Sequence, residues 1–394
     1  MLQATVLGKQ IYDITGRELD IGLIGLAEFL PAALLVLVTG SVADRFDRKI
    51  IGGIAVGFEL FCSMALGFYA LSKPTAVWPL FVIAFVFGCA RAFAAPAVRS
   101  IPPMVAPDGA LPRTIALYSA TWTSAAIIGP ASAGFLYAVD PGIAYFVSAA
   151  LIGIGVSFLL SVKFLRPPTP RSLKDKEEKV SLHTALEGLR FIRRTPILLA
   201  AISLDLFAVL FGGAVALLPA IAEDRLKVGD IAYGWLRAAP GIGAAVTAIF
   251  LASRPVTRRV GRTLLIVVGI FGLATVALGV TTSYVVAFVA LILLAGSDMV
   301  SVYIRGTLVP LVTPDDKRGR VMAVENVFIG ASNELGAFES GVAAQAFGTK
   351  AAVVGGGVAT LGVVALYSIF FPTLRRVDRF EDLESPDDES GRDG

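Results

Sequence analysis

Residues 40–49 read Gly40-Ser41-Val42-Ala43-Asp44-Arg45-Phe46-Asp47-Arg48-Lys49 and lie between two long apolar runs, residues 20–42 and 50–71. A segment this rich in arginine does not lie within hydrocarbon, and the runs beside it are long enough to cross a bilayer. The chain is therefore expected to cross a membrane on both sides of a short, highly charged loop at the membrane surface.

The composition extends this interpretation to the whole chain. Apolar residues make up 56% of the 394 residues and charged residues only 16%, whereas about a quarter of a soluble domain is charged. The sequence has one histidine, and its two cysteines, Cys62 and Cys89, lie inside apolar runs. We therefore predict an all-α, multi-pass membrane protein with no metal site, disulfide or cofactor.

The apolar runs divide the chain into candidate membrane spans. Residues 2–15 are apolar, but at 1.5 Å per residue they are too short to cross about 30 Å of hydrocarbon. Longer runs predict spans near residues 20–42, 50–71, 76–98, 114–138, 143–165, 196–222, 232–252, 262–281, 284–312, 320–347 and 351–372.

The positions of the basic residues predict the orientation. One set of alternate loops holds 25 of the 34 lysines and arginines, and the opposite set holds 5. Loops rich in lysine and arginine stay in the cytoplasm. The charged loop at 40–49, the polar segment after residue 165 and the C-terminus are therefore predicted to be cytoplasmic.

The two parts of the chain repeat each other. At a constant offset of 209, Gly25, Pro31, Arg45 and Lys49 align with Gly234, Pro240, Arg254 and Arg258. Two parallel repeats are typical of secondary transporters, with a pathway between them. The same offset places the start of the first helix about a dozen residues before Met1, which predicts a truncated first helix. A short re-entrant helix is the alternative.

The predicted organisation is a bundle of 12 transmembrane helices, the first one truncated, in two pseudo-symmetric six-helix halves. Leucines and terminal arginines at residues 182–194 predict an amphipathic helix on the inner leaflet. The predicted parts are an N-terminal half with an incomplete first helix (1–165), a cytoplasmic linker that contains the amphipathic helix (166–195), a C-terminal half (196–373) and a disordered acidic tail (374–394).

The spacing G-x-x-x-D-R-x-x-R-K at residues 40–49 resembles the loop between helices 2 and 3 of the major facilitator superfamily, with Asp47 where glycine is usual. The chain resembles in particular the group of bacterial exporters that includes the enterobactin exporter and multidrug-efflux proteins. Residues 12–16, 314–321 and 333–341 fit that group. The resemblance implies that Asp44 faces the start of helix 11 and that Arg45 and Arg48 pair with acids. It implies a cytoplasmic gate motif of Gly40, Asp44, Arg45, Arg48 and Lys49.

A second motif lies in the predicted span at 114–138. Gly129-Pro130-Ala131-Ser132-Ala133-Gly134 resembles the G-P-x-x-G-G signature of superfamily antiporters, with Ala133 replacing the first closing glycine. The alternative interpretation is that Gly129, Pro130 and Gly134 only allow close packing of membrane helices.

Charged residues inside predicted spans mark a candidate pathway, because ionisable groups at membrane depth usually face an interior cavity. An acid in a low-dielectric site can gain and lose a proton at cellular pH, as proton coupling requires. The candidates for proton coupling or the substrate pathway are Arg91, Asp205, Asp298, Glu334 and Glu339. Asp205 and Glu339 lead, with Arg91 as charge partner or anion contact. Static ion pairs between helices are the alternative.

Two more charged residues have different predicted roles. Arg305 lies seven residues after Asp298, on the same face of a helix. Arg305 and Glu325 lie near the predicted cytoplasmic ends of their spans, where snorkelling to the surface or pairing at a gate is expected.

The leading hypothesis is a secondary-active transporter of the bacterial plasma (inner) membrane that exports small amphipathic compounds, drug-like or siderophore-like, by proton-coupled alternating access. Its expected partners are a small-molecule substrate, protons and the lipid bilayer, with no nucleic acid, and it is expected to be a monomer. A facilitator or importer of one metabolite and an inactive truncated transporter are the alternatives. An enzyme is not expected, because no H-E-x-x-H, G-x-S-x-G or nucleotide-binding loop is found.

Overall fold

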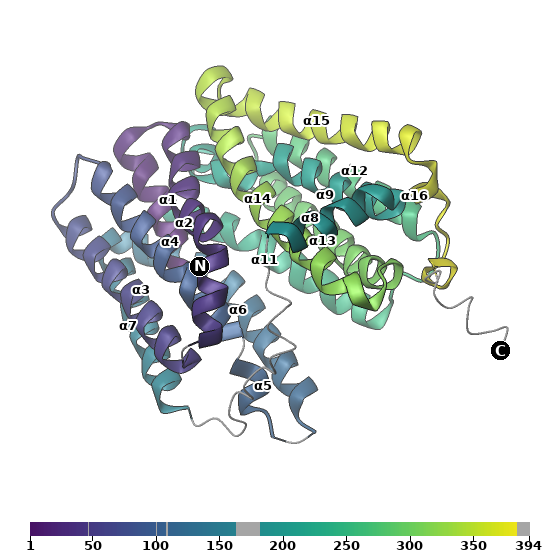
Figure 1. Ribbon diagram of the computed structural model, residues 1–394. Helices are drawn as coiled ribbons and strands as arrows, with labels where there is room; N and C mark the ends of the chain where they lie inside the picture. The colour runs from purple at the N-terminus through teal and green to yellow at the C-terminus, as the bar shows by residue number, and fades with distance from the viewer. Residues whose placement is uncertain (46, 100, 108, 163–181, 384–394) are drawn as a thin grey trace. The chain divides into compact units, whose positions relative to one another are not determined.

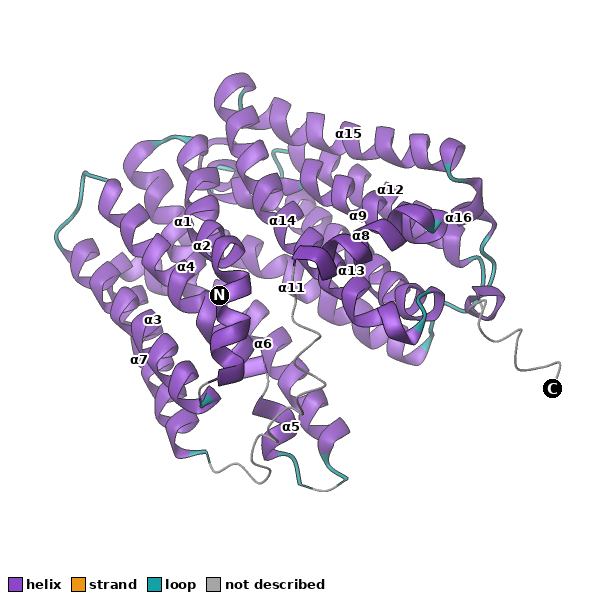
Figure 2. Ribbon diagram, in the orientation of Figure 1, coloured by secondary structure: helices purple, strands orange, loops and turns teal. Residues whose placement is uncertain are grey.

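The computed structural model describes residues 1–394 except 46, 100, 108, 163–181 and 384–394 (Figure 1). All regular secondary structure in the described residues is helical, and no strand is drawn among them (Figure 2). A helix satisfies its backbone hydrogen bonds internally, which makes it the form available to a single segment in hydrocarbon. The chain divides into two compact units, Met1–Glu177 with Leu218–Ala238, and Glu178–Leu217 with Ala239–Gly394.

The first helix of the first unit, α1, is short. Gly16 caps its C-terminus, because a φ of +60° allows the Gly16 N–H to donate to the carbonyl of Tyr12. The unit contains α1 (Leu2–Thr15), α2 (Glu18–Arg45), α3 (Arg48–Leu71), α4 (Trp78–Arg99), α5 (Ile101–Val105), α6 (Leu111–Val139), α7 (Pro141–Ser161), α10 (Leu218–Ala220), a π-helical turn (Ile221–Arg225) and the beginning of α11 (Asp230–Ser253).

The second unit contains the remaining elements. Its core is built from buried aliphatic side chains such as Leu204 on α9, Leu264 on α12 and Leu308 on α13. The elements are α8 (Leu182–Arg194), α9 (Pro196–Phe211), a 3₁₀ turn (Gly213–Leu217), the end of α11, α12 (Val260–Val280), α13 (Tyr284–Val312), α14 (Asp315–Phe347), α15 (Thr349–Phe370), α16 (Pro372–Arg376) and a second 3₁₀ turn (Phe380–Leu383).

Helices lie over all the predicted spans. In the described part of the chain, nine helices are long and apolar enough to cross a membrane, and α1, α2 and α14 are not among them. Large apolar side chains on the spans point outward, such as Phe158 at 71% and Ile249 at 72% exposure, which is the arrangement expected for surfaces in contact with lipid. The count of twelve spans and their grouping into two halves stay predictions.

The charged stretch at residues 40–49 is not a ten-residue loop. Helix α2 continues to Arg45 and α3 begins at Arg48, so only residues 46 and 47 lie between them. A helix can extend beyond the hydrocarbon into water, and a basic residue in its last turn interacts favourably with the helix dipole. The expectation that residues 40–49 form a short loop is therefore wrong, because helices α2 and α3 include most of them.

The predicted span at 196–222 is also not one regular α-helix. Helix α9 ends at Phe211, and a 3₁₀ turn, the short α10 and a π-helical turn follow. At the break, a Cβ on Gly213 would lie 2.2 Å from the carbonyl oxygen of Gly336 on α14. The two backbones approach each other too closely for any other residue, and this contact explains the glycine at the break.

Glycines also bring long helices together elsewhere. A Cβ on Gly88 of α4 would lie 2.2 Å from the backbone oxygen of Glu28 on α2. In the second unit, a Cβ on Gly243 of α11 would lie 2.3 Å from the backbone oxygen of Ile292 on α13. Small residues at such crossings allow the close packing on which helix association in membranes depends.

Helix α8 forms where an amphipathic helix is predicted, and it packs against the beginning of α14. Glu187 accepts a hydrogen bond at 2.8 Å from Arg320 of α14, and the ammonium of Lys317 lies 5.1 Å from the ring centre of Phe191. Ile192 is buried, whereas Leu186 is 59% exposed. The α8 helix is thus attached to α14 by charge and apolar contacts, and its position on the leaflet stays a prediction.

The expectation of a disordered tail from residue 374 is wrong for its first part. Residues up to Leu383 form α16 and a 3₁₀ turn, and the side chains of Leu374, Val377 and Leu383 are buried in the core of the second unit. These three apolar residues lie among charged ones, which hides their periodicity in the sequence. The last eleven residues of the predicted tail, 384–394, lie outside the described residues.

We predict that Gly88→Ala lowers the thermal stability of the purified protein in detergent. The added methyl group would overlap the backbone of α2, and overpacking of this kind costs about 1–3 kcal/mol. Gly155→Ala on α7 is the matched control, because nothing lies within 4 Å of its Cβ position, and it should be neutral or stabilising. Equal melting temperatures for the two variants would contradict the observed crossing.

Candidate functional site

A buried arginine joins three helices of the second unit. The side chain of Arg305 on α13 is 3% exposed, and its guanidinium lies 2.8 Å from the carboxylate of Asp205 on α9. It also donates at 3.3 Å to Glu325 on α14, and at 3.4 Å to the hydroxyl of Ser301, one turn earlier on α13. Ser301 in turn donates at 3.5 Å to Asp205. We call Asp205, Ser301, Arg305 and Glu325 the Arg305 network.

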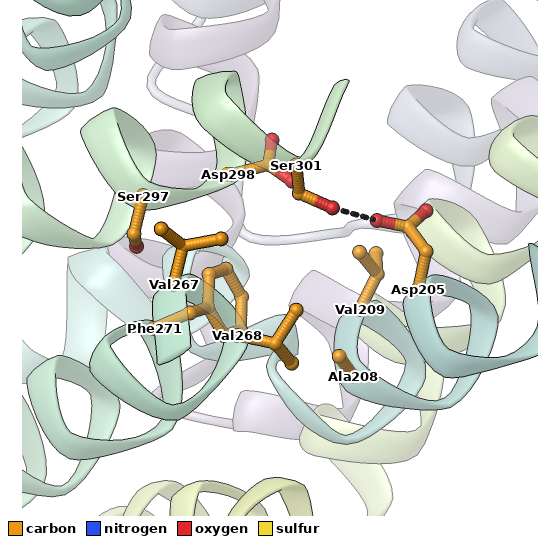
Figure 3. A pocket seen from close by; sticks show the side chains of 9 residues that line it. All are labelled: Asp205, Ala208, Val209, Val267, Val268, Phe271, Ser297, Asp298 and Ser301. Atoms are coloured by element: carbon orange, nitrogen blue, oxygen red, sulfur yellow. Dashed lines mark hydrogen bonds between the residues drawn. The ribbon is translucent and has the colours of Figure 1, made fainter. Parts of the chain in front are cut away.

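A small cavity adjoins this network (Figure 3). It has a volume of about 10 Å³ and is lined by Asp205, Asp298 and Ser301 together with apolar side chains such as Phe271. Figure 3 shows Asp205 and Ser301 directed toward each other, and Ser297, Asp298 and apolar side chains form the rest of the wall. A cavity of this size is at the lower limit for one water molecule, so it does not accommodate a drug-sized compound.

The charges of this region do not balance. Asp298 lies one turn before Ser301 and interacts electrostatically with both Asp205 and Arg305. Among the described residues it has no ion-pair or hydrogen-bond partner. Three carboxylates and one guanidinium therefore lie in one largely buried region, and only two of the carboxylates pair with the guanidinium. Removing charges from water without a partner is costly, so the region favours either proton uptake or a bound cation.

The structure corrects the predicted partner of Asp205. Its cation is Arg305, which the sequence assigns to snorkelling or to a gate; a side chain 3% exposed does not snorkel. Arg91 is instead an exposed residue of α4 in the first unit, where it interacts electrostatically with Glu59 on α3. The reason is packing: α9, α13 and α14 meet around Arg305, a contact that no local spacing reveals.

The two remaining pathway candidates lie on α14 and are half-buried. Glu334 and Glu339 lie on either side of Gly336, whose carbonyl contacts the glycine break after α9. Glu339 is hydrogen-bonded to the neighbouring Ser340. Neither glutamate is part of the Arg305 network, so their predicted role in coupling stays a prediction.

The proposed gate motif is described only in part. Of Gly40, Asp44, Arg45 and Arg48, the structure describes only the helical backbone. Lys49 donates at 2.9 Å to the carbonyl of Val162, at the end of α7. Asp47 accepts at 2.7 Å from the N–H of Lys49 and caps the beginning of α3.

This cap accounts for the unusual residue in the motif. Asp47 has a φ of −61°, a conformation that needs no glycine. The signal was present in the sequence, since an aspartate directly before a helical run is a standard N-cap.

The second motif lies at a helix crossing. A Cβ on Gly134 of α6 would lie 2.5 Å from the carbonyl oxygen of Asp230 and 2.7 Å from the Cα of Gly234 on α11. The carbonyl oxygen of Pro130 also lies close, 2.9 Å from the Cβ position of Gly234. Both the glycine and the proline thus contact α11, which favours the packing interpretation of the motif, and the crossing also explains why its partner is a glycine.

Sequence reasoning missed a second charged cluster, in the first unit. The ammonium of Lys9 on α1 is 8% exposed; it pairs with Asp13, with Glu223 at 2.9 Å and with Asp230 at 3.6 Å. Tyr137 on α6 donates at 2.6 Å to Asp13. A lysine inside an apolar run was the available signal. We call Lys9, Asp13, Glu223 and Asp230 the Lys9 cluster; it connects α1 to the segment that leads into α11.

The sequence of the chain matches a known family of membrane transporters. A family model of the superfamily, described as "Transmembrane secretion effector", matches residues 3–388. The chain belongs to the major facilitator superfamily. Members of this superfamily are multi-pass membrane transporters rather than enzymes, and they act on small-molecule substrates as single chains, usually with ion coupling.

The chain is similar to several bacterial proteins. It is 26% identical over 384 residues to the multidrug efflux pump Tap of Mycolicibacterium fortuitum, which covers 92% of this chain and 90% of that one. It is 28% identical over 260 residues to the uncharacterized MFS-type transporter YfiS of Bacillus subtilis, an alignment that spans 64% of this chain but only 60% of YfiS. Macrolide efflux protein A of Streptococcus pyogenes is 28% identical over 128 residues, 32% of this chain and 31% of that protein.

Solved structures of transporters share the fold. The nucleoside transporter NupG superimposes with a TM-score of 0.71 at 13% identity over 93% of this chain and 94% of that one. A bacterial homologue of the lysosomal transporter Spinster gives 0.67 at 16% identity over 95% and 94%. The fold is therefore that of a major facilitator transporter.

We predict that Arg305→Met destabilises the protein more than Asp205→Asn does. Losing Arg305 leaves Asp205 and Glu325 without their shared cation, and breaking a buried ion pair typically costs about 3–5 kcal/mol. Asp205→Asn leaves Arg305 paired with Glu325. Melting temperatures of both variants and of the double variant, in one detergent, test the order. If Asp205→Asn were the more damaging, the network would not be organised around the arginine.

We predict that Lys9→Met also lowers the melting temperature, since three carboxylates lose a common partner. The expected cost is about 1.5–3 kcal/mol, the range for a hydrogen bond to a charged group. Lys350→Met, which removes an exposed lysine at the beginning of α15, is the control and should change little. A Lys9 variant as stable as this control would show that the cluster is dispensable for the fold.

Proposed function

We propose that this transporter exports small amphipathic compounds, drug-like or siderophore-like, by proton-coupled alternating access. The observation that carries the proposal is the excess of carboxylates over guanidinium around Arg305, whose helix α13 is a candidate membrane span. A site with this imbalance can exchange a proton in each cycle, which is the minimum that coupling to a proton gradient requires.

The Arg305 network supplies two alternative arrangements. With Asp205 ionised, Arg305 pairs with it at 2.8 Å and ties α9 to α13. When a proton neutralises Asp205, the guanidinium retains Glu325 on α14 and can turn toward Asp298, so that the tie to α9 weakens. Protonation is thereby converted into a change in which helices are held together, a two-state element of the kind that conformational coupling needs.

The size of the adjoining cavity suggests which carboxylates bind protons and which line the substrate pathway. About 10 Å³ holds at most one water molecule, which suits delivery of a proton to Asp205 or Asp298. We therefore assign these two carboxylates to coupling and not to substrate contact. Glu334 and Glu339, half-buried on α14, are the acidic candidates for the substrate pathway, and Arg91 on α4 is the basic one.

The two gates in this proposal lie at opposite ends of the helices. By the distribution of basic residues, the Arg45–Lys49 region is cytoplasmic and the Lys9 cluster lies on the outer side. The Lys9 cluster joins α1 to residues 223–230, which the predicted repeat assigns to the C-terminal half. Opening of an outer exit would require the ion pairs of the Lys9 cluster to break. Contacts made by Asp44, Arg45 and Arg48 of the gate motif would keep the inner side closed at that stage.

Export as the direction and the compound class rest on the relatives. Two of them are named as multidrug and macrolide efflux proteins, and a passive facilitator for one metabolite needs fewer buried charges. We place the protein in the bacterial plasma membrane as a monomer with a cytoplasmic C-terminus. A facilitator or importer is the alternative, and it predicts transport without dependence on Asp205 or Asp298.

The test is accumulation of a cationic dye in cells that lack their own efflux pumps, with and without a protonophore. We expect the protein to lower accumulation, the protonophore to abolish that effect, and Asp205→Asn and Asp298→Asn each to weaken it at least tenfold. The reason is that an asparagine cannot exchange a proton at the site.

Glu381→Gln provides the matched control, since this exposed carboxylate lies on the C-terminal segment and its loss should leave dye export unchanged. Membrane levels of every variant are compared by immunoblot. Full export by both aspartate variants, or export that persists with the protonophore, would contradict proton coupling through this network.

A further inference from the structure

A concentration of exposed arginines lies at one end of the second unit, outside the sites described above. Two come directly before α12, one lies in its first turn, one follows α11, and two end α16. All six side chains are exposed, and none has an ion-pair partner among the described residues. We call this set the arginine patch: Arg254, Arg258, Arg259, Arg262, Arg375 and Arg376.

The two parts of the patch are held side by side by the backbone. The N–H groups of Val260 and Gly261 donate at 3.1 Å to the carbonyls of Asp378 and Val377, respectively. The N–H of Arg259 donates at 3.2 Å to the carboxylate of Asp378. Residues more than a hundred positions apart are thus joined by three hydrogen bonds, which bring the arginines of the two segments close together at the surface.

The join is also anchored by packing. The side chain of Leu374 is fully buried and that of Val377 is 6% exposed. A Cβ on Gly261 would lie 1.7 Å from the carbonyl oxygen of Leu374, so only glycine allows this approach. The arginines therefore project from a rigid base and not from a free tail.

The patch adjoins the ends of two candidate membrane spans. Helices α12 and α15 are both candidate membrane spans, Val260–Val280 and Thr349–Phe370. The patch begins directly before the first and resumes five residues after the second. The last residues of α15, Ile369 and Phe370, are each 70% exposed, as expected where a span enters the interface. Basic residues at this position face the phosphates of the nearest leaflet.

We propose that the arginine patch binds the headgroups of anionic phospholipids in that leaflet, which the orientation of the proposed function makes the cytoplasmic one. Arginine suits this ligand, because its planar guanidinium pairs with two phosphate oxygens at once. Several arginines on one rigid base select a membrane with clustered negative charge. Asp378, whose carboxylate accepts the N–H of Arg259, lies within the patch and keeps its backbone in place.

The test uses the full-length protein with dioleoyl-phosphatidylglycerol and with dioleoyl-phosphatidylcholine of the same chain length. Native mass spectrometry counts the lipids that remain bound after release from mixed micelles at equal lipid concentrations. We expect the wild type to retain phosphatidylglycerol several-fold more often. In the triple variant Arg258→Gln, Arg375→Gln and Arg376→Gln, the preference should disappear, because the loss of one basic residue near the surface already weakens such binding by roughly fivefold.

The matched control is Lys73→Gln, Lys227→Gln and Lys350→Gln, which removes three exposed lysines on the opposite predicted side of the membrane. It should keep most of the preference. An equal loss in both triple variants, or no preference in the wild type, would overturn the patch as a lipid site. Displacement of phosphatidylglycerol by an equal concentration of inorganic phosphate would also overturn it, because the site would then recognise a free anion.

This measurement separates the inference from the proposed function. Lipid retention is read without transport, so a patch that binds phosphatidylglycerol stands even if the protein proves to be a facilitator. All three substituted side chains of the patch variant are exposed, and an unchanged melting temperature in detergent verifies that the variant is folded.

Discussion

The structure depends on one constraint: in hydrocarbon, each backbone N–H and C=O must find its partner within the protein. Helices meet this constraint segment by segment, and the described chain is helical from α1 to the turn ending at Leu383. With lipid on the outside there is little apolar driving force between helices, so close backbone contact must hold them together. Gly88, Gly134 and Gly243 lie where the backbones of two helices approach each other closely.

The same constraint makes each buried charge conspicuous. Arg305 and Lys9 are nearly inaccessible to solvent, and each is surrounded by several carboxylates. Neither arrangement is needed for stability alone, because apolar residues of similar volume often stabilise a fold as well as a buried ion pair does, or better. In the mechanism that we propose, their value lies in being reversible, because a proton or a change of partner alters which helices are held together. Helix α9, which carries Asp205, is followed by irregular turns in place of a regular helix. In the proposed mechanism this break is a second point at which the helices can rearrange.

The chain's surfaces divide in a related way. Spans present bare apolar side chains such as Phe158 and Ile249 to lipid, while basic residues gather where spans end. The arginine patch differs from ordinary flanking charges because hydrogen bonds and Leu374 hold its two parts rigidly together. The helix α8 differs as well, since Glu187 and Phe191 attach it to α14. Both elements couple the surface to helices that also carry the Arg305 network or lie beside it.

Sequence alone determined the class of protein, the helices over the apolar runs, and the carboxylates Asp205 and Asp298 as candidates, because hydropathy and the rarity of charge in a membrane are properties of short segments. It did not identify Arg305 as the partner of Asp205, the cluster around Lys9, or the buried anchors Leu374 and Leu383. These joined groups lie far apart in the chain, and only packing decides which charges meet. Asp47 is the intermediate case: its cap is a local interaction, and the sequence did contain the signal. Tertiary structure decided the partners, since the energy of a buried charge depends on what surrounds it and not on its neighbours along the chain.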